Sequence, residues 1–271
     1  MKSTRTTYMA AVSAALIAAT LLGLPRISRA SQPSVPLTVF APAPQQDIAV
    51  SRAAEARLNK DRFSNVTVTV HNAIATLRGT VKLYEDKADA EHRVLRAKGV
   101  TAVRNLIAVA GPVISDSELQ SKLAEKLSFD RVGFGNTFNA ISIHVEDGVA
   151  TVGGHARTYV DRDSALALVS TTPGVKDVIN NVEVDPVSIM DDQTRFAVAR
   201  AVYGYPSLNK YAINPAKPIR ISVQNGHVEL YGVVDSESDK NIAGLRANSV
   251  PGVFSVKNYL QVANETNETK R

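Results

Sequence analysis

The sequence predicts an α+β protein made of three tandem small αββαβ domains, each a three-stranded sheet with two helices packed on one face. Two observations predict this fold. A set of glycines, valines and asparagines recurs three times at fixed offsets, and within each copy the hydrophobic period changes from helical to alternating. The chain has 271 residues, of which 44% are hydrophobic, so it contains enough apolar material for several small cores.

The internal repeat is defined by three glycines, Gly79, Gly154 and Gly232. In every copy a second glycine follows twenty residues later, and a valine comes directly after it. An asparagine then stands six residues beyond that second glycine, with valines four and ten residues beyond it. So many coincidences indicate a repeat. The second glycines are Gly99, Gly174 and Gly252, and the asparagines are Asn105, Asn180 and Asn258.

The first helix and first strand are clearest in the middle copy. Residues 115–118 read Ser-Asp-Ser-Glu, a capping box, and leucines follow at 119, 123 and 127 on one helical face. Ile141, Ile143 and Val145 then alternate with polar residues, which predicts a half-buried strand.

A hairpin turn and a return strand follow. Asp147-Gly148 has the composition of a two-residue turn, matched by Asn225-Gly226 and more loosely by Asn72-Ala73. The return strand points small and branched apolar residues inward. The first glycine of each repeat (Gly79, Gly154 or Gly232), which we call the register glycine, lies on the same face. We expect this glycine to allow a helix to approach the sheet closely.

An aspartate recurs at one repeat position just before the expected second helix, as Asp86, Asp161 and Asp239. Recurrence in all three copies favours helix capping over acid–base chemistry. Pro173-Gly174 and Pro251-Gly252 are expected to stop this helix in the last two copies.

The ends of the chain differ in composition from the repeats. Residues 1–30 resemble a secretory signal, with basic residues before an apolar run and a Ser-Arg-Ala cleavage site; an uncleaved N-terminal anchor is the alternative. Either interpretation predicts a periplasmic chain with no later membrane span. We therefore predict a signal peptide at 1–30, a Pro-rich linker at 31–46, domains at 47–111, 114–187 and 191–263, and a polar tail at 264–271.

The basic pI of about 9.4 does not predict nucleic-acid binding. Residues 1–30 hold four Lys/Arg and no acid, so the remaining chain has 27 basic and 26 acidic residues. Phosphate contacts with DNA or RNA need a concentrated basic footprint, which a nearly neutral chain lacks.

Motifs of enzymatic or metal chemistry are missing from the sequence. The chain has no cysteine, which excludes disulfides, thiol catalysis and a lipid anchor on cysteine. Its five histidines form no HxxxH or HExxH pair, and no G-x-S-x-G elbow occurs. The glycine-rich stretch 132–135 follows no strand and is not expected to bind phosphate. We predict no catalytic residue, metal or cofactor.

The repeat resembles the BON domain, which takes its name from bacterial OsmY and nodulation proteins. The residues that carry the resemblance are a turn glycine, a strand ending in glycine, an Ala-rich helix, and Gly-Val, Val, Asn and Val at the offsets above. The resemblance implies a periplasmic or envelope protein, often associated with phospholipid surfaces, envelope integrity or osmotic stress. Its motifs are structural. The resemblance implies that lipid-binding members use an aromatic residue on a helix of one copy, but this chain has no Trp, so no binding residue is transferred to it.

Charge is divided unevenly among the copies. Residues 47–111 hold 11 basic and 7 acidic side chains, whereas residues 115–187 hold 6 and 11. A basic cluster of this kind attracts anionic lipid headgroups; the alternatives are docking of the first copy on the acidic second copy, or plain solvation. Arg78 and Lys82 alternate with inward residues, so we expect them on the sheet face away from the helices. The other candidate lipid-binding residues are Arg93, Arg96 and Lys98 on the second helix and Arg104 on the last strand.

The third copy contains an insertion that is rich in tyrosine. Tyr203, Tyr205 and Tyr211 are candidate interface aromatics, and the alternative is that they cover the edge of a small core. The function predicted is peripheral association with phospholipid or envelope surfaces under stress. One alternative is a periplasmic chaperone or assembly scaffold that holds client proteins, such as envelope proteins, on exposed sheet surfaces. The other is self-association through open strand edges.

Overall fold

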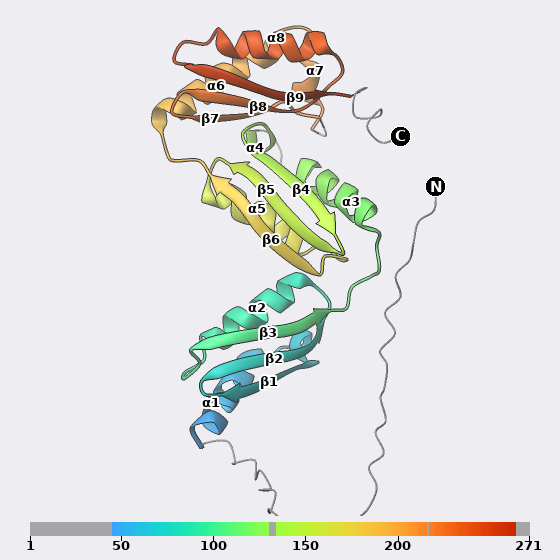
Figure 1. Cartoon of the computed structure of the whole chain (residues 1–271), viewed down its shortest axis with the longest axis vertical. Helices are drawn as coiled ribbons and strands as arrows, with labels where there is room; N and C mark the ends of the chain where they lie inside the picture. The colour runs from blue at the N-terminus through green and yellow to red at the C-terminus, as the bar shows by residue number, and fades with distance from the viewer. Residues whose placement is uncertain (1–44, 130–133, 216, 264–271) are drawn as a thin grey trace, which may run out of the picture. The chain divides into compact units, whose positions relative to one another are not determined.

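The computed structural model describes residues 45–129, 134–215 and 217–263. Helix, strand, strand, helix and strand follow one another three times (Figure 1). This confirms the predicted fold class. The predicted signal peptide, all but the last two residues of the linker, and the polar tail lie outside the described residues. In the described part of the chain, no helix is both long and apolar enough to cross a membrane.

The elements of each repeat have similar lengths. In the first repeat they are α1 (Gln45–Glu55), the 3₁₀ turns η1 (Ala56–Leu58) and η2 (Asp61–Phe63), β1 (Val66–His71), β2 (Ile74–Val81), α2 (Tyr84–Leu95) and β3 (Ala102–Val109). In the second they are α3 (Asp116–Phe129), the one-turn helix α4 (Phe134–Thr137), β4 (Ala140–Glu146), β5 (Val149–Ala156), α5 (Tyr159–Ser170) and β6 (Asp177–Val184). In the third they are α6 (Ile189–Tyr203), α7 (Lys210–Ile213), β7 (Arg220–Gln224), β8 (His227–Val234), α8 (Glu237–Asn248) and β9 (Ser255–Val262).

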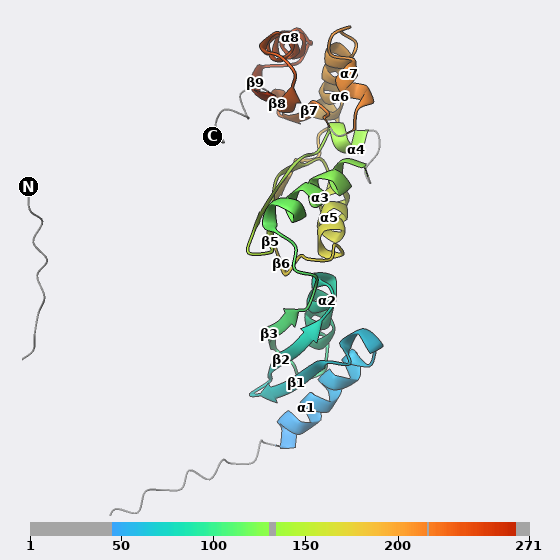
Figure 2. The ribbon, with the colours of Figure 1, turned by 90° about the vertical axis from the view of Figure 1, so that its right-hand side faces the viewer.

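Each sheet is mixed. The second strand is central, pairing antiparallel with the first strand and parallel with the third, as in β1-β2-β3. A parallel pair needs a crossover connection, which the second helix of each repeat provides. The two long helices of a repeat cover one face of its sheet (Figure 2). We call the opposite, uncovered face the open face.

The core of each repeat lies between the sheet and its helices. The predicted inward residues of the central strands are buried, and small residues of the second helix pack against them, since alanine lets the helix lie close to the sheet. The alternating pattern therefore identified the core face correctly. These buried residues are Ala75, Leu77, Val81, Ala90 and Val94, then Ala150, Val152, Ala156, Ala165 and Val169, and lastly Val228, Leu230, Val234, Ala243 and Ala247.

The hairpin turns are held by a carboxylate from the first helix. Asp116 accepts hydrogen bonds from the N–H groups of Asp147 and Gly148 at 2.8 and 2.9 Å. Asp47 binds the turn of the first repeat in the same way, and Asp191 binds that of the third. Each carboxylate therefore satisfies two turn donors that no strand partner reaches.

The capping box at 115–118 is confirmed at its N-cap: the Ser115 hydroxyl accepts the N–H of Glu118 at 3.3 Å. The turn residues take the left-handed conformation that a type I′ turn requires, with φ of 53° at Asp147 and 79° at Gly148. In the first repeat Ala73 takes a φ of 63°, a conformation that disfavours any residue with a Cβ.

The reason expected for the register glycines is wrong. Gly79, Gly154 and Gly232 have φ of 120°, 91° and 133°. A Cβ on them would lie 1.9 to 2.6 Å from a backbone carbonyl oxygen beside the start of the neighbouring strand, and no helix atom is among the nearest neighbours. The glycine is thus required by backbone conformation and strand approach.

The repeated asparagines connect the last strand to the second helix. The side-chain amides of Asn105 and Asn258 donate to the carbonyls of Lys87 and Lys240 at 2.9 and 2.7 Å. Their carbonyl oxygens accept the N–H two residues farther along the strand, as does that of Asn180. A structural hydrogen bond explains why the residue recurs.

The second helices end before the Pro-Gly pairs expected to stop them. α5 ends at Ser170 with Thr171 as its C-cap, and α8 ends at Asn248 with Ser249 as its C-cap. The glycines lie in the following turn, where Gly174, Gly252 and the equivalent Gly99 have φ between 89° and 102°. They allow the turn into the last strand rather than ending the helix.

The second and third repeats share buried contacts. Phe138, which precedes β4, is 1% exposed and packs in the core cluster of the third repeat, edge-to-face with Phe196 at 5.0 Å between ring centroids. Asp185 follows β6 and pairs with Arg195 of α6 at 3.0 Å, with both side chains almost fully buried. Gln224 also donates to Asp185, at 2.8 Å.

The first and second repeats meet through a smaller contact. Tyr84, at the start of α2, packs against the core cluster of the second repeat. Lys87, one turn farther, pairs with Asp177 of β6 at 3.0 Å. Burial and the negative charge of Asp177 raise the pKa of Tyr84, so its hydroxyl stays protonated.

Candidate functional site

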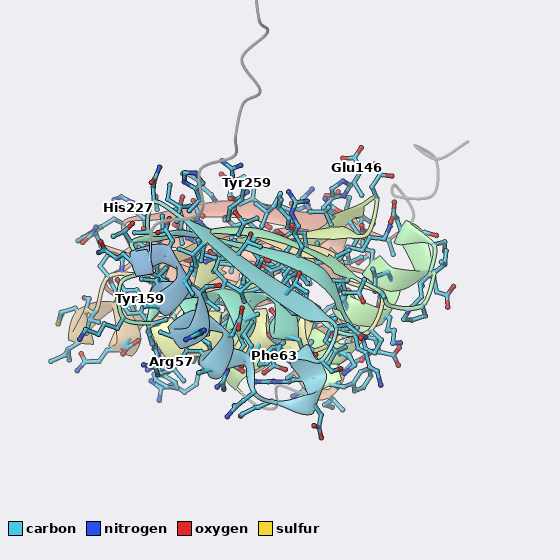
Figure 3. The ribbon with its side chains drawn as sticks, turned by 90° about the horizontal axis from the view of Figure 1, so that it is seen from below. Arg57, Phe63, Glu146, Tyr159, His227 and Tyr259 are labelled. Carbon is cyan, nitrogen blue, oxygen red and sulfur yellow. The ribbon has the colours of Figure 1, made fainter. Side chains whose placement is uncertain are left out.

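The structure distributes the six candidate lipid-binding residues over separate surfaces of the first repeat. Arg78 on β2 and Arg104 on β3 lie on the open face of the sheet, and Lys82 directly follows β2. Arg93 and Arg96 lie on α2 and at its C-cap, with Lys98 in the turn that follows. The second group is on the helix side, where Figure 3 places Arg57 and Phe63 as well.

A basic pocket lies at the C-terminal end of α2. It has a volume of about 350 Å³ and is lined by Arg57, Asp89, His92, Arg93 and Arg96. Residues four apart share one face of a helix, which brings the side chains of α2 to the same opening. Arg57 comes from η1 and donates to the carbonyl oxygen of Arg96 at 3.3 Å. We call this site the basic pocket.

The pocket carries a net positive charge. Its one acidic lining residue, Asp89, accepts from Arg93 at 2.7 Å and also pairs with Arg62. The guanidinium groups of Arg62 and Arg93 lie over the Phe63 ring, 4.8 and 5.8 Å from its centroid. Asp89 is therefore already neutralised by two arginines.

Two cations of the basic pocket remain available to a ligand. Within the described residues, neither Arg57 nor Arg96 forms an ion pair. Leu95 lies beside them on α2, and 46% of its surface is exposed. Guanidinium groups bind phosphate through paired N–H donors, so the pocket suits a phosphate-bearing ligand.

The open face of the first sheet has a different character. Arg78 pairs in register with Thr67 and Leu106, and Arg104 pairs with Thr76. This face therefore carries two arginines among hydroxyls, together with exposed Leu106 and Ile74.

In the part of the chain that the structure describes, the contact between the first and second repeats does not involve the side chains of the six candidate lipid-binding residues. Lys87 and Tyr84 form that contact. Within the described chain, no hydrogen bond or ion pair joins the side chains of the six candidates to the second repeat.

The three candidate tyrosines have different environments. Tyr211 is 3% exposed, and its hydroxyl donates to Asp239 at 2.8 Å. Tyr203 packs against the core of the third repeat and donates to the carbonyl of Ile219; burial raises its pKa to about 12. Tyr205 is 37% exposed and lies near Arg246. Two of the tyrosines are therefore structural, and Tyr205 alone of the three presents a ring to the surface.

The repeated aspartates were expected just before the second helix as its caps, but each is the third residue inside that helix and another residue is the N-cap. Thr158 and Ser236 are the N-caps, and each accepts the N–H of the aspartate three residues on, at 3.1 Å. In the first repeat the N-cap is Leu83, and Asp86 pairs with Arg62 instead.

Two further kinds of site considered from the sequence were a metal site and a phosphate-binding glycine-rich loop. Among the described residues, no group of three His, Cys, Asp or Glu side chains is placed to hold a metal ion. Residues 132 and 133 of the glycine-rich stretch lie outside the described residues, while Phe134 begins the one-turn helix α4, which the sequence did not predict.

Sequence reasoning missed Arg57, because it lies between the first helix and first strand, where the repeat has no fixed spacing. His92 and Arg96 were visible as an i, i+4 pair on a predicted helix. That spacing was the available signal for the basic pocket.

Comparison with known proteins identifies the repeat. The model of the BON domain matches residues 47–111, 115–186 and 205–264. No curated protein matches the chain. Among solved structures, CdsD, a structural protein of the type III secretion system of Chlamydia trachomatis, is 18% identical over 82% of this chain and 97% of its own, with a TM-score of 0.24. The periplasmic domain of PrgH is 9% identical over 73% and 95%, with a TM-score of 0.21.

Both structural similarities are weak and carry no functional argument. The family match covers most of the chain in three tandem segments, as the repeat predicted. The chain therefore belongs to the BON domain family, a non-catalytic family linked to proteins of the bacterial envelope and periplasm.

Proposed function

We propose that this chain is exported to the periplasm and associates peripherally with anionic phospholipid surfaces, supporting envelope integrity under osmotic stress. The basic pocket carries the proposal. Arg57 and Arg96 are free of acidic partners in the described chain, and the pocket is large enough for a phosphate group. Family membership adds the link to the envelope.

The energies expected from this surface suit reversible attachment. Each Lys or Arg near an anionic surface contributes about 1 kcal/mol, and Arg57, Arg93, Arg96 and Lys98 lie at one end of α2. Leu95 adds an apolar contact at the same end. The sum corresponds to weak binding that strengthens on a strongly anionic surface and weakens with salt.

The test is co-sedimentation of residues 31–271 with vesicles of phosphatidylglycerol and with vesicles of phosphatidylcholine, at low and high salt. We expect binding to the anionic vesicles alone, and loss of that binding at high salt. Arg57→Glu/Arg96→Glu should abolish it. No sedimentation with either vesicle would overturn the proposal.

A matched control is available on the other face of the repeat. Arg78→Glu/Arg104→Glu changes the net charge by the same amount, but on the open face of the sheet. We expect this variant to retain most of the binding. Equal loss in the two variants would show that total charge, rather than the basic pocket, determines attachment.

A chaperone or scaffold function is the second candidate, favoured by the open face of the first sheet. Ile74 and Leu106 are 43% and 47% exposed there, between arginines and hydroxyls. An extended client segment would contact such a face through apolar groups, so its binding would persist at high salt. This alternative would be favoured if the protein failed to bind vesicles but still bound an unfolded client protein at high salt.

A further inference from the structure

The open face of the third sheet contains a groove that the proposed function does not use. Its volume is about 500 Å³. Hydrogen-bonding side chains of the third repeat form most of it, and β5 of the second repeat contributes one histidine. The lining residues are His155, Ser222, Gln224, Asn225, His227, Val228, Glu229, Ser255 and Lys257.

The floor of the groove consists of two rows of residues that cross the three strands. In one row Gln224, His227 and Ser255 are register partners. In the next row the partners are Ser222, Glu229 and Lys257. The groove therefore crosses the sheet and does not follow a strand edge, which argues against a peptide added as a further strand.

These side chains are already held in place by one another. His227 Nδ1 and Ser255 Oγ lie 2.8 Å apart, and Lys257 Nζ lies 3.1 Å from Glu229 Oε1. Beneath them, Gln224 donates to the buried carboxylate of Asp185. A ligand would meet donors and acceptors with fixed positions, which lowers the entropy lost on binding.

Exposed aromatic rings flank the groove at both ends. Tyr231 and Tyr259 form the next row and stack with centroids 5.2 Å apart at 21°. At the other end, Phe254 meets the His227 ring at 6.1 Å. Phe254 is 77% exposed and Tyr259 49% exposed.

The electrostatics of the groove disfavour charged ligands. Burial opposes ionisation of Glu229, but hydrogen bonds from Tyr231 and Lys257 outweigh it and lower the pKa of this carboxyl. Glu229 therefore remains an anion that repels phosphate, and Lys257 next to it repels a cation. An apolar ligand would leave the polar lining without partners, which is costly.

An uncharged sugar meets all of these conditions. A pyranose ring carries hydroxyls around its edge, each able to donate and to accept, and C–H groups on its faces that pack on aromatic rings. We propose that the groove binds an uncharged oligosaccharide segment of an envelope glycan, with Tyr259 as the stacking ring and Glu229, Lys257 and His227 as hydrogen-bonding groups.

The test is calorimetric titration of residues 31–271 with uncharged tetramers of N-acetylglucosamine and of glucose. At least one tetramer should bind, with an affinity that changes less than twofold between low and high salt. Tyr259→Ala should weaken that binding at least tenfold. Failure of both tetramers to bind would overturn the proposal.

Tyr159→Ala provides the matched control, because Tyr159 is a 64% exposed tyrosine on the helix side of the second repeat. It should leave sugar binding within twofold of the original. The assignment would be contradicted if both substitutions weakened sugar binding equally. It would also be contradicted if salt weakened sugar binding as strongly as it weakens vesicle binding. Tyr259→Ala should still sediment with anionic vesicles, which separates this site from the basic pocket.

Discussion

The junction between the second and third repeats differs in kind from the junction between the first and second. The former buries an aromatic ring, Phe138, and an almost fully buried ion pair between Asp185 and Arg195. The latter relies on Tyr84 and on one pair, Lys87–Asp177, whose side chains are 18% and 47% exposed. Neighbouring repeats that share a fold and a similar length can therefore be joined by a strong or a weak contact. Residues outside the repeat pattern determine which.

The comparison implies a cooperative unit made of the second and third repeats. Buried contacts join elements into one unfolding unit, whereas exposed contacts break locally at low cost. We expect the first repeat to open independently of the other two. Substitutions at the two junctions test this difference directly.

The largest effect is expected from Arg195→Ala. It leaves the Asp185 carboxylate buried without its cation, and loss of one partner of a buried pair costs about 3–5 kcal/mol. Denaturant unfolding at pH 7 should show a loss of that size. Burial already raises the pKa of Asp185, so the unpaired acid becomes protonated as the pH falls, and the loss should shrink towards pH 4.

The control is the double variant Asp185→Asn/Arg195→Met, which removes both charges together. It should recover much of the lost stability, since neutral replacement of a buried pair is often tolerated. If the single variant loses less than about 1 kcal/mol, the buried pair does not join these repeats.

A smaller effect is expected from Asp192→Asn at the same junction. Arg157 donates to both carboxylate oxygens at 3.1 and 3.2 Å and holds the pKa of Asp192 below its usual range. The pKa of Asp192 is lower in the folded chain than in the unfolded chain, where it is near 4, so its ionised carboxylate stabilises the fold at pH values above about 4. This stabilisation disappears as the pH falls through the pKa of the folded state. The pair is partly exposed, so we expect about 1 kcal/mol or less at pH 7.

Unfolding free energies measured from pH 7 to pH 3 would check this. The original chain and Asp192→Asn should differ at neutral pH and converge at the acidic end. A difference that stays constant over the whole range would exclude Asp192 ionisation as its cause.

The smallest global effect is expected from Lys87→Ala. Exposed ion pairs contribute about 0–1 kcal/mol, and this pair is screened by solvent. Hydrogen exchange should nevertheless increase in the first repeat, with little change in the other two. Equal increases in all three repeats would contradict independent opening of the first.

The sequence predicted the fold because its pattern depends on local spacing. Alternation along β5 placed Val152 and Ala156 inside, and the turn at Asp147-Gly148 followed from its composition. The tandem copies strengthened each interpretation, since a feature that occurs three times at one offset cannot be an accident of one segment.

The carboxylates that hold the hairpin turns could not be found in the same way. Asp47, Asp116 and Asp191 lie 25, 31 and 34 residues before the first turn residue that they bind. The segment between the first helix and the first strand differs in length among the copies, so no fixed offset reveals the relationship. Asp116 was interpreted as part of a capping box alone.

The candidate site was predictable only in part. Arg93, Arg96 and Lys98 could be placed together because they follow one another along a helix and its turn. Alternation with the inward Leu77 also placed Arg78 on the open face, but it gave no sign of Arg57, which reaches the basic pocket from outside the repeat pattern. The pairing of Asp185 with Arg195 depends on a connector outside any repeat.

The carboxylate at each hairpin turn has a consequence for how such repeats diversify. It fixes the start of the first helix to one end of the sheet, so length changes between that helix and the first strand accumulate at the opposite end. The first repeat uses residues 56–65 there, and the third uses residues 204–219, with the extra helix α7. That end is a natural insertion point, where new sequence can be grafted without shifting the strand register.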